Sequence, residues 1–171
     1  NKLISRLKVI RHSISNPKSI SYIKQKQYDI GLHCYPTIYR EEIIKCFRLG
    51  ILNAHIGLLP QLRGRSVTEW GLILGIRPTV STFFIDTGID TGSKLIKKHK
   101  VEIAEIGIND LTEFKAYLFH LDAIMYKSAI VSIFAGGSFV NINDGDGLRF
   151  YRVSKLLEGV AQSRLLNYFQ H

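Results

Sequence analysis

Residues 51–64 read Ile-Leu-Asn-Ala-His-Ile-Gly-Leu-Leu-Pro-Gln-Leu-Arg-Gly, an apolar run that passes into a polar loop. Residues 51–55 are predicted to form a short strand. Because side chains alternate along a strand, Asn53 and His55 project to one face near its carboxyl end. Open α/β sheets bind ligands outside such ends. An amide beside an imidazole can stabilise an oxyanion or handle a proton, although this pair alone is also compatible with a structural role.

A second polar loop, residues 86–92, reads Asp-Thr-Gly-Ile-Asp-Thr-Gly and follows a predicted strand at 79–85. Its glycines permit a tight turn from which two Asp side chains, Asp86 and Asp90, project. One carboxylate facing an imidazole could accept a proton or keep the imidazole charged. The alternative is a loop whose Asp side chains cap their own backbone.

Helical and strand-like segments alternate along the rest of the chain, which predicts an α/β layer structure. Helices are expected at 17–27, with Asn16 as N-cap and Pro17 at the first position, and at 39–49, 66–75, 110–134 and 154–168. The third of these begins with a capping box, Ser66 and Glu69. Further strands are expected at 28–33 and, as an edge strand, at 94–102. Segments 139–142 and 148–151 flank a turn and predict a hairpin.

The length of 171 residues suits about one domain, and 46% hydrophobic residues against 22% charged can bury a core. The net charge of +9 is uneven, because residues 1–48 hold ten Lys and Arg against three Asp and Glu. A basic first part favours an anionic partner such as a phosphate, a nucleotide or a nucleic acid. A solvated, lysine-rich face explains the same composition.

The remaining patterns predict a soluble, reducing, cytoplasmic protein. Cys34 and Cys46 are the two cysteines, and their spacing predicts neither a disulfide framework nor a zinc site. No apolar run reaches the ~18 residues of a membrane span, since His120, Asp122 and Lys127 interrupt the most apolar segment. No signal peptide opens the chain. The histidines other than His55 lack partners at i+3 or i+4, so no metal is expected.

Three motifs, in this order, resemble the N10-formyltetrahydrofolate-dependent formyltransferase family: Asn53-Ala54-His55, then Leu58-Leu59-Pro60 with Arg63-Gly64, and the loop at 86–92. One departure is Gly57, where that family usually has Ser. The resemblance implies a Rossmann-like fold, a mostly parallel sheet with helices on both faces. Residues 1–137 would form the catalytic domain, apparently without its opening strand–helix–strand portion. Residues 138–171 would add a hairpin and a helix.

The resemblance also implies a role for each candidate site residue. Asn53, His55 and Asp90 match the family's catalytic trio, in which an amine attacks the formyl carbon carried by the folate. Asn53 and His55 would stabilise the oxyanion, and Asp90 would orient a water, tune His55 and help to remove the ammonium proton. No metal is needed. The residues expected to line the folate pocket are Tyr35, Ile38, Ile85, Asp86, Thr87 and Gly88.

The acceptor that the resemblance favours is the primary amine of a nucleotide-linked amino sugar, as in the small formyltransferases of bacterial surface-polysaccharide pathways. Methionyl-tRNA and glycinamide ribonucleotide are alternative acceptors. An inactive folate- or partner-binding remnant is another reading. The expected partners are therefore the folate donor and a small anionic amine, without a membrane or a nucleic acid, and a homodimer stays open.

Overall fold

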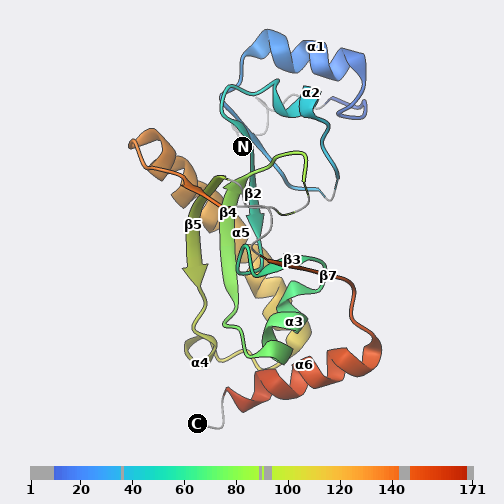
Figure 1. Ribbon diagram of the computed structural model, residues 1–171, viewed down its shortest axis with the longest axis vertical. Coiled ribbons are helices and arrows are strands. Elements are labelled where there is room, and N and C mark those ends of the chain that lie inside the picture. The colour runs from blue at the N-terminus through green and yellow to red at the C-terminus, as the bar shows by residue number, and fades with distance from the viewer. Residues whose placement is uncertain (1–9, 36, 89, 91–93, 143–146, 169–171) are drawn as a thin grey trace, which may run out of the picture.

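A computed structural model describes residues 10–35, 37–88, 90, 94–142 and 147–168, which form a mixed α/β structure (Figure 1). Of the predicted loops, residues 89 and 91–92 and the turn at 143–146 lie outside the described part. The elements in chain order are α1 (Pro17–Lys26), β1 (Ile30–Leu32), α2 (Glu41–Ile44), β2 (Gly50–His55), β3 (Leu62–Gly64), α3 (Val67–Leu74), β4 (Thr79–Phe84), β5 (Lys94–Lys100), α4 (Ile103–Ile106), α5 (Leu111–Phe134), β6 (Val140–Asn141), β7 (Leu148–Phe150) and α6 (Lys155–Asn167).

The main sheet has the order β1-β2-β4-β5-β6, and in it only β1 and β2 run parallel among the described strands. The α/β class is confirmed, but a mostly parallel sheet is wrong for this part of the chain. Parallel neighbours need a connection that returns along the whole sheet, as α2 provides between β1 and β2. The chain between β2 and β4 instead begins and ends at one end of the sheet, because His55 lies opposite Ser81.

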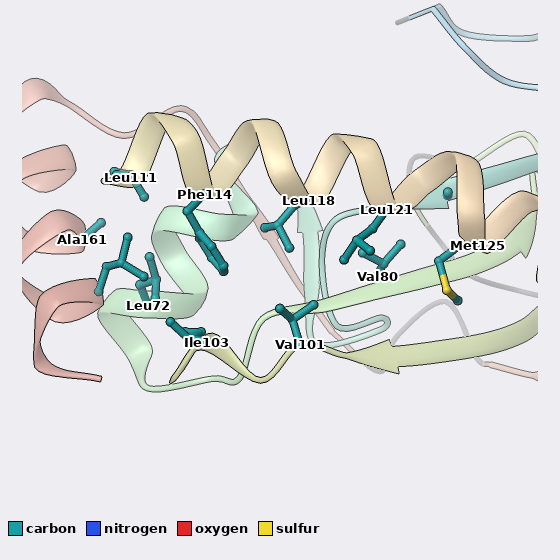
Figure 2. Close-up of a cluster of buried hydrophobic side chains, with 12 residues drawn as sticks. Leu72, Val80, Val101, Ile103, Leu111, Phe114, Leu118, Leu121, Met125 and Ala161 are labelled. Carbon is teal, nitrogen blue, oxygen red and sulfur yellow. The ribbon is translucent and has the colours of Figure 1, made fainter. Parts of the chain in front are cut away.

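One face of the sheet is covered by α5, which packs against β2, β4 and β5. Alternate residues of two strands, Leu52 and Ala54 on β2 and Val80 and Phe84 on β4, face this helix. The buried side chains of the largest cluster run along α5 and reach α6 through Ala161 (Figure 2). This apolar layer holds β2 rigidly from behind, so the residues on its other face have a fixed base.

The opposite face of β2 begins with Ile51, which is buried against α1 and α2. Helices therefore lie on both faces, as predicted. The start of α1 is also confirmed, since the Asn16 side chain accepts a hydrogen bond from Lys18 N at 2.9 Å and Pro17 takes the first helical position. Beyond the cover of these helices, Asn53 and His55 continue the same face of β2.

The strands β6 and β7 do not pair with each other, so the predicted hairpin is wrong. Instead β6 pairs with the edge of β5, and β7 pairs in parallel with β3 in a separate two-stranded sheet. Gly64 permits this second pairing, because its φ is +98° and an added Cβ would lie 2.4 Å from Phe150 O. A segment near the end of the chain is thus joined to the loop that follows β2 (Figure 1).

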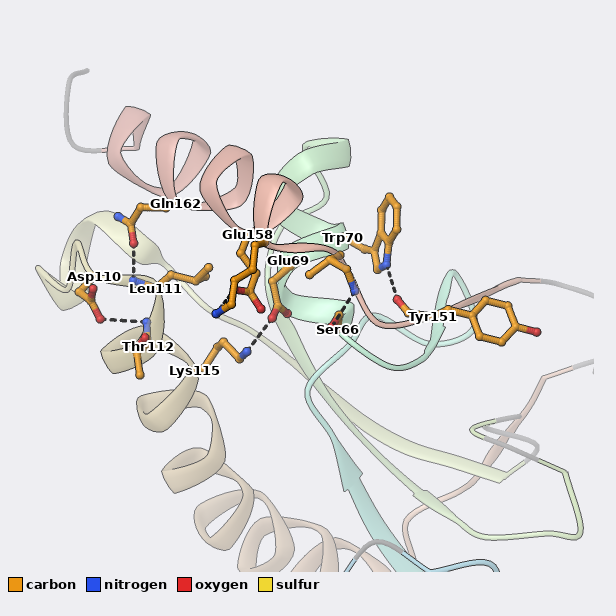
Figure 3. A network of polar contacts seen from close by, with 12 residues as sticks. Ser66, Glu69, Trp70, Asp110, Leu111, Thr112, Lys115, Tyr151, Glu158 and Gln162 are labelled. Atoms are coloured by element: carbon orange, nitrogen blue, oxygen red, sulfur yellow. Dashed lines mark hydrogen bonds and ion pairs between the residues drawn. The ribbon is translucent and has the colours of Figure 1, made fainter.

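Side-chain contacts of α3 strengthen this junction (Figure 3). The Trp70 ring packs on Phe150 with centroids 5.3 Å apart, and Trp70 Nε1 donates to Tyr151 O at 2.8 Å. Ser66 Oγ accepts from Val153 N at 3.4 Å. The predicted capping box is therefore wrong: Ser66 makes no capping bond, and Glu69 is buried and paired with Lys115 Nζ at 2.6 Å.

By length and composition α5 could cross a membrane, with a mean hydropathy of 1.2 over its best 18-residue window. The core helix of a soluble protein passes the same test, and here α5 packs along three strands. Its start is set by Asp110, whose side chain accepts from Thr112 N and Glu113 N at 2.9 Å. In this structure α5 packs one side on the sheet, and 22% of that window is buried.

One carboxyl group on α5, that of Asp122, makes stability depend on pH. Burial raises its pKa from 3.8 to about 7, and its Oδ1 has no hydrogen-bond partner within the described residues. The folded state therefore prefers the neutral acid. The contribution of the neutral Asp122 side chain to the stability of the fold is complete below about pH 4. It is lost as the pH rises through about 7.

Replacing Asp122 by Asn should remove this loss. We expect Asp122→Asn to exceed the wild type in unfolding free energy by roughly 1–3 kcal/mol at pH 8, and to differ little at pH 4. Urea titrations of both proteins across this range measure the difference. A difference that is the same at both pH values would contradict the assignment.

Candidate active site

Asn53 and His55 lie on the face of β2 that α5 does not cover, and each is only 8% exposed. Phe83 and Ser81 stand opposite them on β4. Behind β2, the Tyr126 hydroxyl of α5 accepts from Ala54 N at 3.1 Å and donates to His33 O. These two hydrogen bonds hold the backbone at Ala54, the residue between Asn53 and His55, so both polar side chains project from a fixed backbone.

The His55 ring is held between two acceptors. Its Nε2 lies 3.0 Å from Leu62 O, and a carbonyl oxygen can only accept, so this nitrogen donates. Its Nδ1 lies 3.7 Å from Asp90 Oδ1. The two ring nitrogens therefore each face an oxygen that can accept a hydrogen bond.

Asp90 is placed by its backbone and by Gly64. Its φ of 47° lies in the left-handed region, which is uncommon for a residue with a side chain. Its Oδ2 accepts from Gly64 N at 3.1 Å, while Oδ1 faces His55. Because β4 is antiparallel to β2, the loop after Phe84 must return across the sheet face to bring Asp90 to His55. The structure thus brings all three predicted residues to one place.

Asn53 and Asp90 line a cleft of about 1040 Å³, and His55, which is not part of that lining, lies next to it through its contact with Asp90. Four of the residues predicted to line the folate pocket do line it, namely Ile38, Ile85, Asp86 and Gly88; Tyr35 and Thr87 are exposed and are not part of its lining. In the loop, Asp86 Oδ1 accepts from Gly88 N at 2.8 Å, so this Asp does cap its own backbone. The two interpretations of the loop therefore apply to different residues: Asp86 caps its own backbone, and Asp90 faces the imidazole of His55.

Sequence reasoning missed two groups in the lining. The first group consists of His33 and Tyr39, and His33 Nδ1 lies 3.1 Å from the Tyr39 hydroxyl. Burial lowers the pKa of His33, and the Asp90 carboxylate opposes this shift. The other group comes from the far end of the chain, at residues 149–152. No spacing rule relates these residues to β2, so only the pairing of β7 with β3 reveals them.

The arrangement suits acyl transfer. A buried amide and an imidazole share one face, and a carboxylate backs the imidazole, which are the groups that such a reaction requires. Among the described residues, no three His, Cys, Asp or Glu side chains gather where they could hold a metal ion. Fold and site together define an α/β protein whose polar side chains suit chemistry at a carbonyl carbon.

The comparison with protein families agrees. The sequence model of the formyl transferase family matches residues 2–130, so the chain belongs to this family. A methionyl-tRNA formyltransferase of Ruminiclostridium cellulolyticum is 27% identical over 140 residues, which are 81% of this chain and 44% of that protein. The chain spans less than half the length of this relative and of the other curated relatives it matches most strongly.

Two solved structures show the same fold. A methionyl-tRNA formyltransferase from Clostridium thermocellum has a TM-score of 0.62 at 19% identity, covering 88% of this chain and 68% of that one. A formyltransferase from Anoxybacillus kamchatkensis was solved with UDP-4,6-dideoxy-4-formamido-L-AltNAc and tetrahydrofolate. It has a TM-score of 0.60 at 19% identity, covering 96% of this chain and 86% of that one. At these identities the likeness concerns the fold.

Proposed function

We propose that this chain transfers a formyl group from N10-formyltetrahydrofolate to the primary amine of a nucleotide-linked amino sugar. The observation that carries the proposal is that Asn53 and Asp90 line one cleft and that His55 contacts Asp90 beside it. Membership of the formyl transferase family supports the reaction class. The amino sugar is supported by the neighbour from Anoxybacillus kamchatkensis, whose structure contains such a formylated nucleotide sugar and tetrahydrofolate.

The cleft fits a folate donor. Glycine backbone at Gly64 and Gly88 and apolar side chains at Ile38 and Ile85 contribute to its lining, so main-chain groups and apolar surface are both available. A flat heterocycle with several hydrogen-bonding atoms needs this combination. The volume of about 1040 Å³ is at the upper end of typical ligand sites, so it leaves room for a second molecule beside the donor.

The three side chains would divide the work of the transfer. The acceptor amine would attack the formyl carbon of the donor, and the bond from that carbon to N10 would then break, so that tetrahydrofolate leaves with a proton on N10. Asn53 would donate its amide hydrogens to the formyl oxygen as that oxygen gains negative charge. His55, held between Leu62 O and Asp90, would place positive charge beside it. Asp90 would keep that ring charged and help to take up the proton that the amine releases.

The space beside the His55 ring depends on Gly57. A Cβ at this position would lie 2.7 Å from His55 Nε2 and 2.9 Å from Leu62 O. We therefore expect Gly57→Ala to push the imidazole off this carbonyl, to slow formyl transfer at least tenfold and to destabilise the fold by about 1–3 kcal/mol. Gly159→Ala is the matched control, because nothing lies within 4 Å of its Cβ position and it lies in α6. That control should keep full activity.

Methionyl-tRNA is the second candidate acceptor, and the curated relatives favour it, since those that match most strongly are methionyl-tRNA formyltransferases. A cytoplasmic location and a homodimer stay predictions. The division of the chain near residue 137 also stays a prediction, although β7 lies beside the loop that holds His55.

The deciding experiment offers the purified chain its donor with a panel of acceptors. The protein is incubated with N10-formyltetrahydrofolate and either nucleotide-linked amino sugars, glycinamide ribonucleotide or methionyl-tRNA, and formylated product is measured by mass spectrometry. We expect product with at least one amino sugar. Product with methionyl-tRNA alone would replace the acceptor, and folate binding without turnover on any acceptor would indicate an inactive remnant.

A further inference from the structure

Three arginines line the wall of the cleft that β3, β7 and the residues just after these strands provide. Arg65 follows β3, Arg149 lies in β7, and Arg152 follows β7. The parallel pairing places Arg149 opposite Arg63, and Arg65 N donates to Phe150 O at 3.1 Å. The pairing of the two strands thus brings all three residues to the lining of one cleft.

These guanidinium groups have no counter-charge of their own. Among the residues that the structure describes, no hydrogen bond or ion pair links the side chains of Arg65, Arg149 or Arg152 to a carboxylate; Arg149 contacts only the Tyr151 ring, 5.7 Å from its centroid. Two other exposed arginines do have carboxylate partners, Arg48 with Asp29 and Arg77 with Glu102. Three positive charges beside one cleft repel each other, and an anion bound between them would reduce this repulsion.

Among the described residues, two acids line the same cleft, Asp86 and Asp90. Asp90 is engaged with His55 Nδ1 and Gly64 N, and Asp86 Oδ1 accepts from Gly88 N. The cleft therefore has its carboxylates on the loop after β4 and its free positive charge on the segment around β7. A molecule that binds with an amine toward Asp90 and an anionic group toward the arginines would match both ends.

We propose that Arg65, Arg149 and Arg152 form a phosphate subsite that anchors the diphosphate of the acceptor. The planar guanidinium fork binds phosphate oxygens in pairs. Three positive charges beside one cleft match the several anionic oxygens of a diphosphate better than the single charge of a carboxylate or a neutral sugar. The exposed Tyr151 ring beside Arg149 adds a flat surface next to the diphosphate. This inference rests on the proposed function for the identity of the acceptor, but the anion subsite can be tested without turnover.

The test is calorimetric titration of the full chain with UDP, with pyrophosphate and with ribose 5-phosphate at 0.15 M salt. The variants are Arg149→Gln, Arg152→Gln and the double variant, with Arg164→Gln on the exposed side of α6 as control. We expect each cleft variant to raise the Kd for UDP and pyrophosphate about tenfold and the double variant more, while the control matches the wild type. Tighter binding of ribose 5-phosphate than of UDP would overturn the assignment to a diphosphate.

Two further readouts separate this inference from the proposed function. A folate analogue should bind all variants alike, which also shows that they are folded. In the transfer assay, the cleft variants should raise KM for the amino sugar with kcat nearly unchanged. Turnover that is indifferent to both substitutions overturns the subsite and leaves the function standing. Arginine-dependent UDP binding without turnover leaves the subsite standing. Binding of tRNA, but not of UDP, that depends on these arginines overturns the small acceptor.

Discussion

An Asp90→Asn variant should form N-formyl product about 10²–10³-fold more slowly than the wild type, with nearly unchanged binding of a folate analogue. The substitution removes the negative charge 3.7 Å from His55 Nδ1. It keeps an oxygen that can accept from Gly64 N, so the loop should stay in place. The variant therefore tests the charge of Asp90 rather than its contribution to the fold. Single-turnover kinetics with saturating donor measures the effect.

The matched control for this experiment is Asp29→Asn. Asp29 is half-exposed and pairs with Arg48, away from the residues that line the cleft. Its replacement should leave the transfer rate within about twofold, because exposed ion pairs contribute little. If Asp90→Asn transfers formyl groups as fast as the control, Asp90 is not part of the chemistry. Equal losses in both variants would point to a general effect on the protein.

The second large effect is on stability. Replacing Lys115 by Met should destabilise the fold by about 3 kcal/mol, because it leaves the Glu69 carboxylate buried without a cation. Glu69 is 1% exposed, its Oε1 lies 2.6 Å from Lys115 Nζ, and its Oε2 has no hydrogen-bond partner within the described residues. Figure 3 shows this pair between α3 and α5. Urea denaturation at pH 7 measures the loss.

Lys45→Met provides the comparison, since it breaks a lysine–glutamate pair of similar length in which both partners are exposed. Lys45 Nζ lies 2.7 Å from Glu41 Oε1, with the side chains 72% and 64% exposed. We expect a loss below about 1 kcal/mol. The double variant Glu69→Gln with Lys115→Met should recover much of the loss, because no buried charge remains unpaired. Equal destabilisation by Lys115→Met and Lys45→Met would refute the role of burial.

The sequence predicts the site better than the sheet. Strand alternation alone places Asn53 and His55 on one face, and the motif order adds Asp90 to them. The strand directions could not be predicted from the sequence. An alternation of helices and strands suggests parallel strands, but the same alternation occurs when the connecting segment stays at one end of the sheet and the strands are antiparallel. The connection between β2 and β4 contains one helix, the eight-residue α3, and it begins and ends at the same end of the sheet. β2 and β4 are therefore antiparallel.

The pairing of β3 with β7 shows a different limit of prediction. Each strand has three residues, too few for a periodic signal, and they are far apart in the chain. What joins them is tertiary: a glycine at Gly64 that admits Phe150 O, and a tryptophan on α3 that binds Tyr151 O. The arginines of the cleft follow from this pairing, so they could not be found without it.

The same pairing sets the order in which the molecule matures during synthesis. The ribosome releases β2, β3 and the loop with Asp90 well before β7 emerges. A nascent chain can therefore assemble most of its sheet while the backbone of Leu62–Gly64, which contacts both His55 and Asp90, still lacks its neighbouring strand. The segment that contacts His55 and Asp90 thus gains its neighbouring strand only when residues 148–150 dock.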